Sequence, residues 1–325
     1  MATVSSKQES IARNPGMPLD LEWVAACRVN RSATERRAAT LVTRRTVKKD
    51  WQAGWLLHAV TCTDLTTLGG DDTPGTVQRL CVKARQPVRA DLLSALGFEG
   101  EPLQVGAVCV YHSFVGQAAK LLEGTGIPVA AVAAGFPHGL SPFRERIHEI
   151  QASVAAGAKE IDIVINRQLV LNSQWQELYD EVQQFRDACG DAHLKSILAT
   201  GELGTLSNVA KASMVCMMAG SDFIKTSTGK ETANATLAYG LTMTRCIRHY
   251  AERTGYKIGF KPAGGIRTAK SALDYMILMK EELGDAWLSP NLFRLGASAL
   301  INDIERQLEH HVTQRYAASY KQPLG

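Results

Sequence analysis

Two lysines at the ends of short apolar runs are the residues of this sequence best suited to covalent chemistry. Lys225 ends the run that begins at Phe223, and Lys261 ends the run that begins at Ile258; a glycine-bearing turn follows each lysine. Burying an unpaired ammonium group is costly. Such a lysine is therefore either a side chain whose charged head reaches water or an amine held neutral as a nucleophile. For one lysine alone, the first interpretation is the more common.

The spacing of the two lysines favours the nucleophile. They are 36 positions apart, and a helical pattern runs from about Ala233 to Arg253 between them. One helix and one return connect neighbouring parallel strands, which lie about 4.8 Å apart. Two inward ammonium groups roughly 4 Å apart repel by about 4 kcal/mol at an effective dielectric near 20, or about three pKa units. One lysine should thereby approach neutrality, and a neutral lysine forms Schiff bases with aldehydes.

The elements that would position these lysines follow an α/β pattern. From Leu56, short apolar segments alternate with amphipathic helical segments. Near-continuous apolar strands indicate a sheet covered on both faces. Eight strand–helix units without a dinucleotide glycine fingerprint favour a single closed (β/α)8 TIM barrel. The expected strands are Ala59–Leu65, Val105–Tyr111, Val129–Phe136, Glu160–Ile165, His193–Ala199, Phe223–Thr226, Ile258–Lys261 and Leu292–Gly296.

Charged residues also interrupt other expected strands. Asp64 lies near the end of the first strand, Asp162 in the fourth and Lys195 in the fifth. Each could be a structural ion-pair partner. Together with the two lysines they predict three cations and two anions inside one barrel, whose active sites lie at the C-terminal ends of the strands. Cys109, in the second strand, is either close to a substrate or a buried structural thiol.

Three glycine-bearing loops follow the last three expected strands. They contain Gly229 and Lys230, then Gly264 and Gly265, then Gly296 and Ser298. Backbone N–H groups beside glycine at helix N-termini bind anions, and the usual phosphate site of the barrel follows strands seven and eight. Glycine also simply permits turns. Three such loops in succession predict a small-molecule substrate that carries phosphate.

The residues before the barrel are expected to form an N-terminal helical extension. Met1 to about Pro18 is polar and is expected to be mobile. Helices over Leu19–Arg28 and Ser32–Val47 follow. Basic residues on and just after the second helix are dispersed, which favours a solvated face over an anion-binding patch: Arg36, Arg37, Arg44, Arg45, Lys48 and Lys49. The expected division is extension 1–55, barrel 56–312 and C-terminal tail 313–325.

Composition excludes several classes of protein. The formal net charge of +4 does not call for a nucleic-acid partner. Seven cysteines without a CxxC pair argue for reduced thiols in the cytosol. The first residues lack the apolar core of a signal peptide, and no apolar run approaches the 18 or so residues of a membrane span. We expect a soluble cytoplasmic protein with no membrane partner, and a homo-oligomer is compatible with the sequence.

The segments around both lysines resemble the deoxyribose-phosphate aldolase family. The resemblance is carried by Phe223–Lys230 and Gly259–Arg267, and also by Asp64–Leu68, Glu160–Val164 and Gly296–Ser298. It covers roughly residues 59 to 304, and the long N-terminal extension resembles the eukaryotic type. It implies a class I aldolase on a TIM barrel without metal or cofactor. The implied reaction is the reversible cleavage of 2-deoxy-D-ribose 5-phosphate to acetaldehyde and D-glyceraldehyde 3-phosphate.

The resemblance also implies a role for each charged residue. Lys225 occupies the Schiff-base position, and Lys261 matches the second lysine, which depresses the pKa of the first. Asp162 matches the aspartate that moves protons through the carbinolamine and enamine. Lys195 resembles the lysine that pairs with this aspartate, and Asp64 the strand-one aspartate near the site. An iminium acts as an electron sink, so no metal is expected.

Two departures from the family pattern stand out. Many relatives have a second hydroxyl residue where this chain has Ala299, so one side-chain contact to phosphate is missing. Some relatives end in a tyrosine that folds back to the site. Tyr316 and Tyr320 are candidates here, but the tail continues to Gly325, and neither is assigned.

Two other functions fit the same residues. The nearer one is a class I aldolase or transaldolase-like barrel that acts on a different phosphosugar. The other is a barrel that binds phosphosugar or nucleic acid without catalysis, using its basic helix. The presence of all the lysines and of Asp162 argues against the second.

Overall fold

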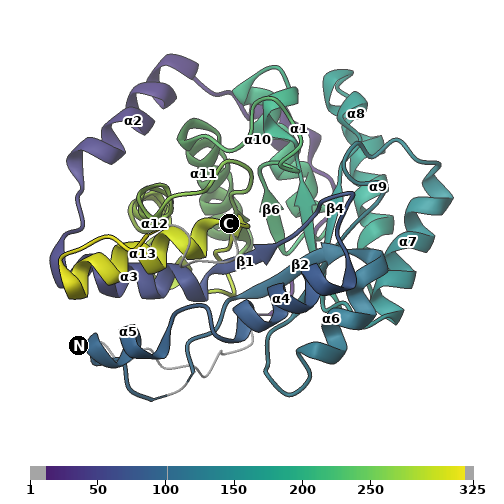
Figure 1. The fold of residues 1–325 in the computed structure, drawn as a ribbon. Coiled ribbons are helices and arrows are strands. Elements are labelled where there is room, and N and C mark those ends of the chain that lie inside the picture. Colours follow the sequence, from purple (N-terminus) through teal and green to yellow (C-terminus); the bar gives the residue numbers. More distant parts are fainter. Residues whose placement is uncertain (1–11, 101, 319–325) are drawn as a thin grey trace.

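Eight parallel strands form one sheet that closes into a barrel (Figure 1). The computed structural model describes residues 12–100 and 102–318. The strands are β1 Thr63–Thr66, β2 Ala107–Tyr111, β3 Val129–Ala133, β4 Glu160–Val164, β5 His193–Ile197, β6 Phe223–Lys225, β7 Gly259–Lys261 and β8 Leu295–Ala297. They follow one another around the sheet, and β8 also pairs with β1. Isolated bridges from Phe260 to Phe293 and from Ala263 to Gly296 join β7 to the β8 segment. The (β/α)8 TIM barrel is confirmed.

Helices surround the strands on the outside (Figure 1). They are α1 Leu21–Ala26, α2 Arg31–Arg44, α3 Lys49–Thr61, α4 Pro74–Arg85, α5 Ala90–Ala95, α6 Val115–Leu121, α7 Phe143–Ala155, α8 Arg167–Leu171, α9 Trp175–Ala188, α10 Leu206–Met218, α11 Leu237–Thr254, α12 Ala269–Leu283 and α13 Leu300–Thr313. Short 3-10 helices cover His112–Phe114, Thr200–Glu202 and Asp285–Trp287. Among the described residues, no helix combines the length and apolar character that crossing a bilayer requires.

Local sequence signals set the two ends of α11, the helix that connects the strands of the two lysines. Thr236 caps the start of α11 by accepting a hydrogen bond from the N–H of Tyr239 at 3.2 Å. Gly255 ends the helix with a φ of +79°, in the left-handed region that glycine adopts without strain. The chain then returns into β7, whose register places Lys261 directly beside Lys225 of β6.

The segment before α1 is held against the barrel. Asn14 is buried: its amide donates to the carbonyls of Met217 at 2.7 Å and Ser221 at 2.9 Å, and its backbone N–H donates to Asp222 at 3.0 Å. Tyr250 donates its hydroxyl to the Asn14 side chain. The expectation of a mobile segment up to Pro18 is therefore wrong for the part around Asn14, while residues 1–11 lie outside the described residues.

The basic side chains on and just after α2 are largely exposed, and three of them share one acidic partner. In Figure 1, α2 lies at the periphery of the molecule, and it packs on α11 and α12. Arg37, Arg44 and Arg45 all bind the carboxylate of Glu281 near the end of α12, at 2.7, 2.6 and 2.7 Å. The prediction of a solvated face is confirmed by this exposure. The pairing with Glu281 was not predicted, because this acidic partner lies more than 230 positions away along the chain.

Several strand boundaries also differ from the sequence prediction, most clearly at the starts of the first and last strands. Residues 59–61, expected to begin the first strand, are the last turn of α3, which was not predicted as a helix. Its apolar end, with Leu56, Leu57 and Val60 buried, resembles a strand because a short buried run has no clear helical period. The last strand begins at Leu295, three residues later than expected, and Phe293 forms only an isolated bridge.

Candidate active site

The carboxylate of Asp162 is the centre of the site. Its Oδ2 accepts hydrogen bonds from Nζ of Lys225 at 2.8 Å and from Nζ of Lys261 at 2.7 Å. Its Oδ1 accepts from Nζ of Lys195 at 2.9 Å. Side chains alternate between the two faces of a strand, and the register pairs Asp162 with Lys195 and Lys225 with Lys261. Four neighbouring strands thus direct these side chains to one point inside the barrel.

A second set of charges lies behind this centre. Asp64 contacts Lys261 through Oδ2 at 2.5 Å and Arg294 through Oδ1 at 2.6 Å. Glu160 contacts Lys195 at 2.5 Å and Arg294 at 2.8 Å. All of these side chains are buried. The cluster comprises four cations, Lys195, Lys225, Lys261 and Arg294, and three carboxylates, Asp64, Glu160 and Asp162.

Burial and neighbouring charges shift the pKa values of Lys225 on β6 and Lys261 on β7 in opposite directions. Burial lowers the pKa of Lys225; Asp162 opposes this effect and the charge of Lys261 adds to it. Burial also acts against the charge on Lys261, but Asp162 and Asp64 outweigh it and raise the pKa of Lys261. The pKa values of the two neighbouring amines are thus shifted in opposite directions, downward for Lys225 and upward for Lys261. The sequence argument attributed this to repulsion between the lysines, whereas burial is the larger cause.

The carboxylates remain ionised despite their burial. Burial alone would raise the pKa of Asp162, but its three lysine partners hold it well below the usual value. Asp64 has a lowered pKa for the same reason, because Lys261 and Arg294 outweigh its desolvation. The centre therefore combines a permanent carboxylate with a lysine amine 2.8 Å away.

A small apolar cluster lies on strands β2 to β5. Cys109 belongs to a separate buried cluster with Ala130, Val132, Phe136, Val164 and Ile197, and Leu68 and Tyr111 pack against it. Burial raises the pKa of the Cys109 thiol, so the thiol is protonated. The charges of Lys261, Asp162 and Lys225 all act on this thiol, which places Cys109 beside the ion cluster. The apolar wall suits a small uncharged fragment next to the amine.

The glycine loops differ in which backbone donors are free. Gly264 and Gly265 have φ values of +84° and +82°, which side chains rarely adopt. The N–H of Gly229 instead donates to the carboxylate of Glu231 at 3.1 Å, and the N–H of Thr228 donates to the same group at 2.9 Å. The carboxylate of Glu231 therefore already occupies the backbone donors of this turn.

Gly296 is needed for close packing. Its N–H donates to the carbonyl of Pro262 at 2.9 Å, which helps to close the barrel. A Cβ added at this position would lie 2.8 Å from the Cβ of Ala263 and 3.2 Å from Cε of Lys261. Ser298 and Lys230 are exposed beyond the ends of their strands.

The structure brings together all five charged residues that the sequence singled out. The members that sequence reasoning missed are Glu160 and Arg294. A signal for both was present: Glu160 lies two positions before Asp162 on the same strand face, and Arg294 is a cation in an expected apolar strand. Ala299 is the N-cap of α13 and makes no side-chain capping bond. Tyr316 stacks on His310 at 4.1 Å, and Tyr320 lies outside the described residues.

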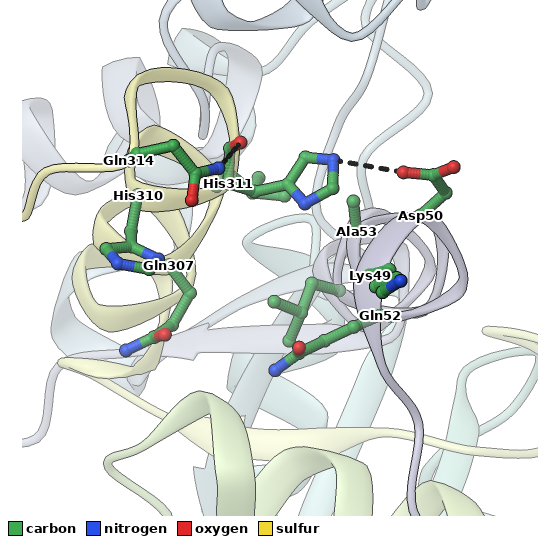
Figure 2. A pocket seen from close by; sticks show the side chains of 10 residues that line it. Lys49, Asp50, Gln52, Ala53, Gln307, His310, His311 and Gln314 are labelled. Atoms are coloured by element: carbon green, nitrogen blue, oxygen red, sulfur yellow. Dashed lines mark hydrogen bonds and ion pairs between the residues drawn. The ribbon is translucent and has the colours of Figure 1, made fainter.

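Two surface hollows formed by the described residues lie away from this cluster. One, of about 450 Å³, lies between α3 and α13, where His311 faces Asp50 at 3.4 Å (Figure 2). The other, of about 440 Å³, is lined by α1, α2, α10 and α11. None of the seven charged residues lines either hollow. Among residues 12–100 and 102–318, no group of three or more histidine, cysteine or acidic side chains could hold a metal ion.

The family model and the curated relatives that match this chain agree on one family. Residues 62–303 match the model of the DeoC/LacD family aldolases. Deoxyribose-phosphate aldolase of Homo sapiens is 60% identical over 97% of this chain and 99% of its own length. That of Bos taurus is 58% identical over 97% and 99%. A solved structure of deoxyribose phosphate aldolase from Aeropyrum pernix covers 86% of this chain and 99% of its own, with a TM-score of 0.58 and 20% identity.

Proposed function

The chain belongs to the DeoC/LacD family of aldolases, and we propose that it cleaves 2-deoxy-D-ribose 5-phosphate reversibly to acetaldehyde and D-glyceraldehyde 3-phosphate. It is a lyase of the class I type. One observation supports the proposal above all others: the Lys225 amine, with its lowered pKa, lies 2.8 Å from an ionised carboxylate and beside a charged lysine. A neutral amine, a proton acceptor and a proton donor are what Schiff-base chemistry requires.

In the proposed mechanism, Lys225 is the nucleophile. Its amine attacks C1 of the open-chain sugar, and loss of water from the carbinolamine gives an iminium. Removal of the proton from the C3 hydroxyl lets the C2–C3 electron pair move into the iminium, which releases D-glyceraldehyde 3-phosphate and leaves an enamine on Lys225. Protonation at C2 and hydrolysis then release acetaldehyde. Asp162 and Lys261, 2.7 Å apart, are the acceptor and donor that move these protons.

We assign the substrate phosphate to the ends of β7 and β8. Gly264 and Gly265 contribute backbone N–H groups, and α13 starts just after Ser298, so that its N-terminal dipole favours an anion. Lys230 contributes its side-chain charge from the exposed end of its loop. Gly229 and Gly296 shape their loops, because their N–H groups already have partners in Glu231 and Pro262. The apolar wall with Cys109 would cover the two-carbon fragment.

Trapping of the covalent intermediate tests this function. The protein is incubated with acetaldehyde, reduced with borohydride and mapped by mass spectrometry, with Lys225→Ala and Lys261→Ala in parallel. We expect the adduct on Lys225 and none in Lys225→Ala. An adduct on Lys261 would exchange the two assigned roles, and its absence from a well-folded sample would refute the catalytic assignment.

Substrate profiling separates the nearest alternative. A class I aldolase of another phosphosugar would process fructose phosphates in preference to deoxyribose 5-phosphate, and that preference would refute the substrate assignment.

Four further properties stay predictions: the placement in the cytoplasm, the division at residues 55 and 312, the absence of metal and homo-oligomerisation. Size-exclusion chromatography with light scattering measures the last of these directly.

A further inference from the structure

The buried cluster contains unequal numbers of the two charges. Four cations face three carboxylates, and all seven side chains are buried. If every group carried its charge, one positive charge would lie uncompensated inside the barrel. Burying such a charge is strongly unfavourable, and a titratable group usually gives up its charge instead.

The geometry selects the group that becomes neutral. Lys225 contacts a single carboxylate, that of Asp162. Lys261 contacts two carboxylates and Lys195 contacts three. The guanidinium of Arg294 also contacts two, and it cannot lose its proton in a protein. Deprotonation of Lys225 therefore sacrifices one ion pair, whereas deprotonation of either other lysine sacrifices at least two.

We propose that Arg294 and Glu160 are positioning residues for the reaction, because together they fix the charge balance that makes Lys225 the neutral amine. The inference rests on the proposed function, in which Lys225 is the nucleophile. Arg294 and Glu160 do not contact Lys225. They act through Asp64 and Lys195, which in turn hold Lys261 and Asp162.

Other titratable groups close to the cluster do not change the balance. The Cys109 thiol faces it from β2, and burial keeps this thiol protonated by raising its pKa. His193, on β5 next to Glu160, is partly buried, and desolvation lowers its pKa, which favours the uncharged imidazole. The count of four cations and three carboxylates therefore covers the charged side chains of the cluster, of which Asp162 and Lys261 act on Lys225 directly.

Single substitutions at the two positions should move the Lys225 pKa in opposite directions. Arg294→Gln leaves three cations with three carboxylates, so Lys225 holds its proton more tightly. Glu160→Gln leaves four cations with two carboxylates, so Lys225 loses its proton more easily. A unit charge about 10 Å away, at an effective dielectric near 20, changes a pKa by about one unit. The double variant restores an excess of one cation and should return the pKa to that of the unchanged protein.

The test is the pH dependence of kcat/KM for deoxyribose 5-phosphate with the full-length protein. The acidic limb reports ionisation of the free enzyme. Labelling of Lys225 by an amine-selective reagent, quantified by mass spectrometry across the same pH range, assigns the limb to this residue. We expect the pKa of the acidic limb to rise by about one unit in Arg294→Gln and to fall by about one unit in Glu160→Gln. In the double variant, this pKa should return to that of the unchanged protein. Arg294→Lys keeps the charge, so its limb should stay in place even if kcat falls.

A limb that stays in place in both single variants, or that moves in the same direction in both, would overturn the inference. If Arg294→Gln does not fold, the other two variants decide: a double variant whose limb coincides with that of Glu160→Gln contradicts the role of Arg294. The proposed function fails differently. In that case the unchanged protein forms no adduct on Lys225 with acetaldehyde, whereas failure of the inference alone leaves the adduct intact.

Discussion

Replacing either lysine on β6 or β7 by methionine should stop the reaction, but only one of the two replacements should destabilise the fold. Lys225 contacts one carboxylate oxygen, and Asp162 keeps Lys261 at 2.7 Å and Lys195 at 2.9 Å without it. Its loss leaves three cations with three carboxylates. We expect Lys225→Met to change the free energy of unfolding by less than about 1 kcal/mol, because a methionine fills a similar volume and the remaining charges are balanced.

Lys261→Met is the matched contrast. Lys261 bridges Asp64 at 2.5 Å and Asp162 at 2.7 Å, and Oδ2 of Asp64 has no well-aligned hydrogen bond besides this ion contact. Removing one partner of a buried ion pair costs about 3–5 kcal/mol. We therefore expect Lys261→Met to lower the free energy of unfolding by about 3 kcal/mol or more. Urea unfolding followed by circular dichroism, with equal m-values for the compared proteins, measures both changes.

The stability difference between the unchanged protein and Lys225→Met should also depend on pH, in a direction set by the lowered pKa of Lys225. The native pKa of Lys225 is lowered below 10.5, so the unfolded chain binds a proton that the native protein lacks in the window between the two values. Stability of the unchanged protein relative to Lys225→Met should therefore increase as the pH rises through that window towards 10.5. Equal losses in the two methionine variants, or a larger loss in Lys225→Met, would refute the idea that Lys225 is the least-paired cation.

Three further predictions concern positions outside the buried charge cluster. Asn14→Ala should lower the free energy of unfolding by about 2–3 kcal/mol, measured in urea, because it strips partners from buried backbone groups. Gly296→Ala should lower kcat at least about tenfold by displacing Lys261. Gly54→Ala, where a Cβ meets open space, is its control and should leave kcat unchanged. Glu281→Gln should cost about 1 kcal/mol at low salt and less at 1 M salt, where surface ion pairs are screened.

Sequence reasoning predicted that Asp162 and its three lysine partners converge, because strand alternation and short connections are local properties. Lys225 and Lys261 each end a three-residue strand, and one helix connects the two strands. This short connection makes the strands neighbours in the sheet, so the two lysines can be paired from the sequence alone. Arg294 has the same local signal, but its meaning depends on Asp64 and Glu160, which lie 230 and 134 positions away. A count of the charges inside the barrel needs the three-dimensional pairing.

The errors at the N-terminus have a related cause. The helix α3 is stabilised by packing on α12 and α13, so tertiary contacts outweigh the strand-like run near its end. The arginines of α2 appeared unpaired in the sequence because Glu281 occurs much later in the chain. Propensity and charge pattern describe a segment alone, whereas these elements obtain their stability from distant parts of the barrel.

The attachment of Asn14 has a consequence for the timing of biosynthesis. Its partners Met217 and Ser221 lie 203 and 207 positions later in the chain, and Tyr250 lies 236 positions later. At translation rates of about 5–20 residues per second, the segment around Asn14 leaves the ribosome about 10–40 seconds before the residues that it binds. The segment around Asn14 therefore cannot dock until residues 217 to 250 have been synthesised, by which time six of the eight strands have been made.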